Sequence, residues 1–467
     1  MSSAQPSLLE RSLVALTLIV LVALPLPVGS NRSWAIGFFT LLIGVAAVLW
    51  AIGQWRGVFK ESRALKPALP MVLMLLLTQI WVAVQWLGGL TVDVGATMQS
   101  LIIGVGYTLL FVLVISLFHT RKRLSLLLGT LVVSGTLQAF YGSFVTLSGL
   151  EGMLGSSSSS KSGTFINRNS LAGYLTLTLS AGIGLLLALR NPSAFSWAQL
   201  IELLMGPKAR LRLALVIMVI ALVMTHSRGG NASFFIGLMI VGSVFVLRSK
   251  TNRMRNILIL ASVVLIDVLV ISQYFGLERL KDRVVNTRLT DTVLMTEEVV
   301  TEVVDGKEVQ SRVQHKEVVQ KANELRGAVF LYALPLAQEK PFIGQGAGSF
   351  EAVFPKYPGD DIRLHFDLAH NEYIQFAIEY GALGGLPLIV FVLMALYWAF
   401  KALWQQRSLY RNGIGFGAAM GIIAVLSHAT VDFDLQIPAN AATFVVLCAI
   451  AVLANHHRKE RSERTQV

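Results

Sequence analysis

Three arginines and one histidine lie in polar clusters that interrupt or flank the long apolar runs of this chain. A guanidinium can bind phosphate oxygens through two parallel hydrogen bonds, so Arg168, Arg228 and Arg326 are candidates for holding an anionic group. An imidazole exchanges protons near neutral pH, which makes His370 a candidate for proton transfer. The clusters read T-F-I-N-R-N at 164–169, T-H-S-R-G-G at 225–230, R at 326 followed by G-Q-G-A-G-S-F at 344–350, and A-H-N-E-Y at 369–373.

Structural roles are open for the same residues. Asn167 and Asn169 can cap the start of a helix, and Arg168 can anchor the chain to phospholipid headgroups. Arg228 sits between two apolar runs with almost no loop, and an anionic substrate group is a natural partner for its charge. The histidine and serine at 226–227 could form a base and a nucleophile, but adjacent side chains in a helix point about 100° apart, which disfavours that pair.

The remaining polar residues offer a similar choice. The glycines at 344–348 can expose backbone amides to a phosphate, but they lack a βαβ frame, which favours a tight turn that returns the chain to the membrane. A lone histidine such as His370 is often structural. Asp432, in H-A-T-V-D-F-D at 428–434, can orient a histidine or an arginine, or cap a helix end. No cluster has metal-ligand spacing, and D-F-D matches a D-x-D site only in letters, so no metal is expected.

The elements that position these residues are membrane helices. Of the 467 residues, 54% are hydrophobic and 14% are charged, whereas soluble domains carry about 25% charged residues. A helix needs roughly 20 apolar residues to cross a bilayer. The runs of about that length are 13–29, 34–53, 69–88, 98–118, 124–146, 169–189, 212–225, 231–247, 256–274, 381–400, 412–430 and 438–455. The fold class predicted is all-α integral membrane, with about 12 transmembrane helices and a first helix that is retained.

Lysine and arginine mark one side of this frame. They gather in alternate short loops, at 56–66, 121–123, 208–212, 248–255, 401–411 and 458–464. The positive-inside rule places these loops and both termini in the cytoplasm, so all the polar clusters face the outside, which in a bacterial inner membrane is the periplasm. The net charge of +12 comes from these loops and not from a basic domain, so membrane lipids, and no nucleic acid, are the expected partners.

The same topology divides the chain. Residues 1–274 hold helices one to nine, 275–369 form a large periplasmic loop between helices nine and ten, 370–455 hold helices ten to twelve, and 456–467 are a cytoplasmic tail. Within the loop, 296–319 predicts a hairpin around Asp305 and Gly306. Residues 322–339 predict an amphipathic helix that Pro335 should kink or end. Its apolar face consists of Leu325, Val329, Tyr332 and Leu336.

Taken in order, the clusters resemble the family of O-antigen ligases and O-antigen polymerases. The matching pieces are F-I-N-R-N at 165–169, T-H-S-R-G at 225–229, R at 326 followed by P-F-I-G-Q-G-A-G-S-F at 341–350, A-H-N-E-Y at 369–373 and H-A-T-V-D-F at 428–433. Each piece is short, but five in this order on a twelve-helix frame are specific. The first five helices match only in hydropathy, and His226 departs from the pattern of many relatives.

The resemblance implies a glycosyltransferase that takes a glycan from undecaprenyl diphosphate at the periplasmic face, with no nucleotide or metal cofactor. It implies that His370, Arg228 and Arg326 are catalytic. Further substrate-binding candidates are Arg168, Asn167, Asn169 and Asp432. The chemistry agrees, because a diphosphate leaving group already activates the sugar, so the enzyme needs cations for the phosphate charge and a base for the acceptor hydroxyl. Such a displacement would invert the anomeric centre.

Several functions remain in competition. A ligase passes the glycan to lipid A-core in lipopolysaccharide biosynthesis, a polymerase passes it to another carrier-linked repeat, and protein O-oligosaccharyltransferases share parts of the motifs. The late large loop with its arginine-bearing helix favours the ligase. A glycan transporter would need more ionisable groups inside the spans, where Asp267 is the one clear carboxylate. A structural scaffold would leave the outer arginines and His370 unexplained.

Overall fold

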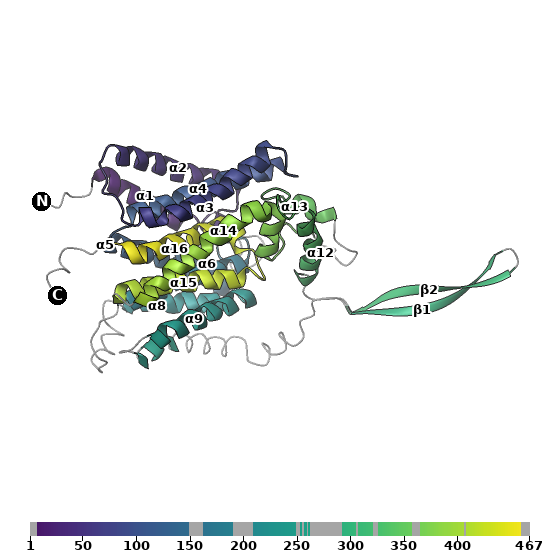
Figure 1. The fold of residues 1–467 in the computed structure, drawn as a ribbon. Coiled ribbons are helices and arrows are strands. Elements are labelled where there is room, and N and C mark those ends of the chain that lie inside the picture. The colour runs from purple at the N-terminus through teal and green to yellow at the C-terminus, as the bar shows by residue number, and fades with distance from the viewer. Residues whose placement is uncertain are drawn as a thin grey trace.

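The protein is a bundle of long helices with a small outer part at one end (Figure 1). The computed structural model describes residues 7–148, 162–189, 209–248, 253–254, 256–258, 260–261, 292–304, 307–320, 326–356, 365–405 and 408–458. The bundle helices are α1 (Leu8–Ala23), α2 (Ser33–Trp55), α3 (Leu65–Leu87), α4 (Val94–Leu117), α5 (Arg121–Ser148), α6 (Arg168–Ala188), α8 (Ala209–Met224), α9 (Arg228–Arg248), α14 (Glu372–Gln405), α15 (Leu409–His428) and α16 (Pro438–His456).

Within the described residues, nine of these helices are long and apolar enough to cross a membrane. The exceptions are α1 and α8, each of 16 residues. Eleven of the twelve runs predicted from the sequence therefore correspond to a helix, and most of the remaining run, 256–274, lies outside the described residues. The chain is accordingly a multi-pass membrane protein.

The centre of the bundle is formed by α6 and α16, which are buried along almost their whole length. A small-residue contact joins α6 to α15: a Cβ added at Gly184 would lie 2.7 Å from the Cα of Gly417. Small residues at such crossings let membrane helices approach closely and gain packing contacts. By contrast, α2 and α3 expose apolar side chains such as Leu41 and Leu73, as helices that face lipid do.

The ends of the bundle differ in chemistry. At the end where α1 begins and α16 ends in Figure 1, Arg123 forms an ion pair with Glu10, and the Arg458 side chain donates to the Glu61 carbonyl at 2.6 Å. The Arg121 N–H also donates to the Arg458 carbonyl, so the described parts of three cation-rich segments predicted to share one side, 56–66, 121–123 and Arg458, are in contact there. The polar clusters lie at the opposite end.

The outer part contains a hairpin and three short helical elements at the end of the bundle where α14 begins (Figure 1). Strands β1 (Thr292–Val304) and β2 (Lys307–Gln320) pair antiparallel with Val304 opposite Lys307, which confirms the predicted hairpin. The predicted turn residues, 305–306, lie outside the described residues. Helices α12 (Arg326–Glu339) and α13 (Phe350–Val353) and the 3-10 turn η2 (Phe354–Lys356) lie beside the start of α14 and share a small core with it.

The amphipathic helix predicted before Pro341 is confirmed, with one difference. Val329 and Leu336 of α12 are fully buried against a small second core. However, α12 continues through Pro335 to Glu339, so the helix does not end at the proline, and the kink that was the other expectation stays a prediction. Pro335 and Leu331, four residues earlier, both lie on the exposed face, where water can bind the carbonyl that loses its N–H partner.

Candidate functional site

The candidate site is assembled where several helices begin at the same end of the bundle. The Asn440 side chain, near the start of α16, donates to the Ser170 carbonyl in the first turn of α6 at 3.0 Å. The Glu372 N–H, at the start of α14, donates to the Ala429 carbonyl just after α15 at 2.9 Å. A Cβ added at Gly229, in the first turn of α9, would lie 2.9 Å from the His428 ring. Helix N-termini present unpaired N–H groups and partial positive charge, which suits an anion.

His370 stands immediately before α14 in an unusual backbone conformation. Its φ is +52°, in the left-handed region that residues other than glycine rarely adopt and that clusters at functional sites. Its ring centroid lies 6.0 Å from that of Phe366 and 4.8 Å from that of Phe433, so two aromatic rings fix its position. Its side chain is 19% exposed, and its Nδ1 lies 3.9 Å from Asp432 Oδ1. The structure therefore brings together two of the residues predicted from the sequence.

Behind Asp432 lies a second histidine and carboxylate pair. The Asp432 Oδ2 atom is 3.9 Å from His428 Nε2, and His428 Nδ1 is hydrogen-bonded to Asp434 Oδ2. All three side chains are nearly fully buried. Burial raises the pKa of Asp434, and the charge and hydrogen bond of His428 oppose that rise. The His428 ring therefore favours the ionised form of a carboxylate that burial would otherwise protonate.

Arg228 is the first residue of α9 and is exposed. The residue before it, Ser227, is buried and accepts the Gly230 N–H at 3.1 Å, so its hydroxyl caps α9. This contact gives Ser227 a structural role in place of the nucleophile considered from the sequence. His226 has a φ of +56° in the tight turn between α8 and α9, and its function is unassigned.

The first cluster is placed at the start of α6. Asn167 is the N-cap of this helix, because its side-chain oxygen accepts the N–H groups of Asn169 and Ser170, both at 2.9 Å. Arg168 is exposed beside it, whereas Asn169 is 8% exposed. Phe165 is fully buried against Tyr174, with ring centroids 5.2 Å apart, which fixes the segment onto the helix. The capping interpretation is thus confirmed for Asn167, and Arg168 is left facing outward.

The glycine run is a structural turn. Gly344, Gly346 and Gly348 all have positive φ values, and the amides of this run are used within the protein. The Gln345 N–H donates to the Ile378 carbonyl at 2.7 Å, and the Gly346 N–H donates to the Glu379 carbonyl at 3.1 Å. These bonds support the turn that the sequence favoured over phosphate binding.

Arg326 is the first residue of α12, and the side chains of this helix are described from Val329 onward. Val329 belongs to the same small core as Ala369 and Ile374, which flank His370. The helix that carries Arg326 therefore packs on the segment that carries His370. The position of the Arg326 side chain remains a prediction.

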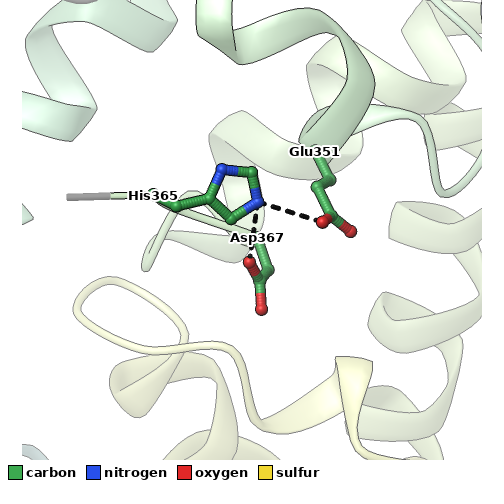
Figure 2. Close-up of side chains that lie close together, drawn as sticks. All are labelled: Glu351, His365 and Asp367. Atoms are coloured by element: carbon green, nitrogen blue, oxygen red, sulfur yellow. Dashed lines mark hydrogen bonds and ion pairs between the residues drawn. The ribbon is translucent and has the colours of Figure 1, made fainter.

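Within the described residues, one group of side chains could ligate a metal ion: Glu351, His365 and Asp367 (Figure 2). The His365 Nε2 atom lies 3.0 Å from a Glu351 oxygen and 3.2 Å from an Asp367 oxygen. The hydrogen bond that the His365 ring donates to Glu351 and the charge of Asp367 raise the pKa of His365, and all three side chains are well exposed. An ion pair that ties α13 to the segment before His370 accounts for this geometry, although sequence spacing gave no sign of it.

Sequence reasoning missed two carboxyl groups of the site. The Glu372 side chain is 1% exposed, and its Oε1 accepts the Leu435 N–H. Asp434 was considered only as part of a D-x-D match. The sequence feature that could have indicated their burial is that each adjoins an apolar run. However, an acidic residue at a helix end is usually solvated or caps the helix. Their burial depends on how the start of α14 packs against the end of α15 and the segment that follows it.

Comparison with known proteins bears on these motifs directly. No curated protein matches the chain. Residues 213–389 match the model of a family described as O-antigen ligase. This segment runs from α8 into α14 and contains Arg228, Arg326 and His370. The part of the chain that carries three of the predicted functional residues therefore matches the O-antigen ligase family, which supports the recognition made from the motifs.

Proposed function

We propose that this protein is an O-antigen ligase that transfers a glycan from undecaprenyl diphosphate to lipid A-core. The observation that carries the proposal is the pairing of His370 with Asp432 at the end of the bundle where α6, α9, α14 and α16 begin. A base beside an anion-attracting surface, at the end of a membrane bundle, fits a reaction between two lipid-anchored substrates. The family match over residues 213–389 supports the same reaction class.

His370 is the proposed general base. Because its Nδ1 faces Asp432, the carboxylate favours the tautomer with the proton on Nδ1 and leaves Nε2 to accept a proton. The acceptor sugar hydroxyl gives its proton to Nε2 while its oxygen attacks the anomeric carbon. The bond from that carbon to the phosphate oxygen breaks, and the lipid diphosphate leaves with the electron pair. A separation of 3.9 Å exceeds hydrogen-bond length, but such contacts commonly tighten when substrate binds.

The cations and helix ends are proposed to hold the diphosphate. Arg228 is exposed at the start of α9, and Arg168 is exposed at the start of α6. These two helices pack against each other, since a Cβ added at Gly230 would lie 2.5 Å from the Ala172 Cβ. Both guanidinium groups thus extend from neighbouring helix N-termini, where phosphate charge is favoured. Arg326 is the third proposed cation, and Asn167 and Asn169 complete the proposed binding region.

The site is proposed to face the periplasm of the bacterial inner membrane. The end of the bundle with Arg123 and Arg458 carries the basic loops, which the positive-inside rule places in the cytoplasm. The site lies at the opposite end. A periplasmic site agrees with a glycan that is already attached to its lipid carrier.

Two experiments test the proposed function. Purified protein should transfer glycan from a lipid-diphosphate donor to purified lipid A-core. A strain that lacks the protein should lose polymer-capped core while carrier-linked polymer accumulates. If the strain instead makes core with a single repeat, the protein is a polymerase. If core is capped normally and a glycosylated protein disappears, it is a protein O-oligosaccharyltransferase.

A further inference from the structure

We infer that His428 and Asp434 are positioning residues: they hold Asp432 toward His370 and set the pH range in which His370 can accept a proton. The inference rests on the proposed function, because it assumes that His370 is the base. Neither residue touches the reacting groups in this proposal. Both act through Asp432.

The geometry is an alternating row of carboxylates and imidazoles. Asp434 is hydrogen-bonded to one ring nitrogen of His428, and the other ring nitrogen lies 3.9 Å from Asp432 Oδ2. The second oxygen of Asp432 faces His370 at 3.9 Å. Asp432 is therefore placed between two imidazoles, with one oxygen directed at each. The row leads from a partly exposed histidine into the interior.

Burial determines the charge of this row. Two nearly fully buried carboxylates flank His428, and an ionised carboxylate without a cation is costly away from water. His428 also lies in the last turn of α15, where the helix dipole favours a positive charge. An imidazolium at His428 gives the three inner residues a net charge of about −1, by the usual charges of these groups. A proton on His370 then neutralises the whole row.

Other charged groups surround the row. Glu372 at the start of α14 lies close enough to Asp432 and Asp434 for their charges to interact. Arg228 adjoins Gly229, whose backbone meets the His428 ring, and His226 lies in the same turn. From α6, Gly173 packs against Asp434, and Arg168 begins that helix. These groups affect the pH at which His370 accepts a proton. They are the same in each variant considered below, so they do not change the comparison between variants.

Charge removal at two points of the row should move the pH profile in opposite directions. His428→Gln removes a positive charge, so His370 keeps its proton to higher pH. The acid limb of the pH–rate profile should therefore move to higher pH. Asp432→Asn removes a negative charge, so the acid limb should move to lower pH. A charge within a few ångströms of a titrating group commonly displaces its titration by about half a pH unit or more. A purely structural role predicts less folded protein with an unchanged profile.

The test is the rate of transfer by full-length purified enzyme between about pH 5 and pH 9, the range in which histidine titrates. For His428→Gln we expect a roughly 10-fold lower kcat, an unchanged donor KM and an acid limb displaced upward. His457→Gln is the matched control. His457 is also buried, but it follows α16 at the opposite end, and burial lowers its pKa to about 4, so its replacement removes no charge near neutral pH. Its profile should equal that of the native enzyme.

The outcomes separate this inference from the proposed function. One outcome has an inactive His370→Gln enzyme and a His428→Gln acid limb that stays in place or moves in the same direction as that of Asp432→Asn. In that case the inference is wrong and the assignment of His370 as the base stands. If His370→Gln retains full turnover, the base assignment fails first. Asp434→Asn would leave the net charge of the inner residues at about −1 if His428 also lost its proton, so its acid limb should stay near its native position. Should His428→Gln not fold, His428→Asn serves instead. It removes the same positive charge as His428→Gln, so its limb should move to higher pH, and an unmoved limb overturns the inference.

Discussion

Replacing Asp432 with asparagine isolates the contribution of its charge to the site. The two side chains have nearly the same size, and the asparagine oxygen can still accept the Phe433 N–H that Asp432 Oδ1 accepts at 3.0 Å. The fold should therefore be retained. The lost interaction is that between the carboxylate and the imidazolium that forms on His370 during transfer.

The magnitude follows from the separation of 3.9 Å between Asp432 Oδ1 and His370 Nδ1. Two unit charges at this distance interact by about 4 kcal/mol at an effective dielectric constant of about 20. The His370 side chain is 19% exposed, so water screens part of this energy, and about 1 to 2 kcal/mol should remain. That range corresponds to a fall in kcat of roughly 5- to 30-fold. The donor KM should not change, because Asp432 binds no phosphate in this account.

The assay is steady-state transfer with purified donor and acceptor, with kcat and KM determined separately. Asp93→Asn is the matched control, since Asp93 caps α4 by accepting the Ala96 N–H at 2.9 Å, and asparagine caps equally well. It should keep full activity. An Asp432→Asn enzyme with native kcat, or with a raised donor KM alone, would refute the reasoning about its charge.

Three further results are expected. A reporter fused after Gly359 should be active only in the periplasm and one fused after Lys250 only in the cytoplasm; the reverse pattern would contradict the proposed orientation. Arg228→Ala should abolish transfer while the protein stays folded, and Arg228→Lys should restore little because the two-pronged hydrogen bond is lost; a fully active lysine variant would show that charge alone suffices. Asn167→Ala should lower the free energy of unfolding by about 0.5 to 2 kcal/mol through loss of the α6 cap, measured by thermal unfolding in detergent; unchanged stability would contradict that role.

The long elements of this fold could be predicted because a bilayer constrains them strongly. Every backbone polar group must be paired inside the membrane, so an apolar run of span length becomes a helix. The spacing of Val329, Tyr332 and Leu336 likewise placed the buried face of α12. These are local patterns, in which the residues that carry the signal also form the element.

The inner half of the site could not be predicted, because it depends on contacts between distant segments. Glu372 is buried against a segment distant in sequence, where its side chain accepts the N–H of Leu435, beyond α15. His370 has a left-handed backbone, and its ring lies between Phe366 and Phe433, which are far apart in the sequence. Neither feature has a periodic pattern or a fixed spacing in the sequence. Motifs identified the candidate residues, and only the packing of α14 and α15 showed which of them meet.

The most direct test of the central claim is transfer by the His370→Gln enzyme from a purified lipid-diphosphate donor to purified lipid A-core. Glutamine keeps hydrogen bonding without basicity, so we expect kcat to fall by roughly 10²- to 10⁴-fold while the donor still binds. The native enzyme should remain active in EDTA. Normal turnover by His370→Gln would contradict the assignment of His370 as the base, and a strict need for a divalent metal would contradict the metal-free mechanism.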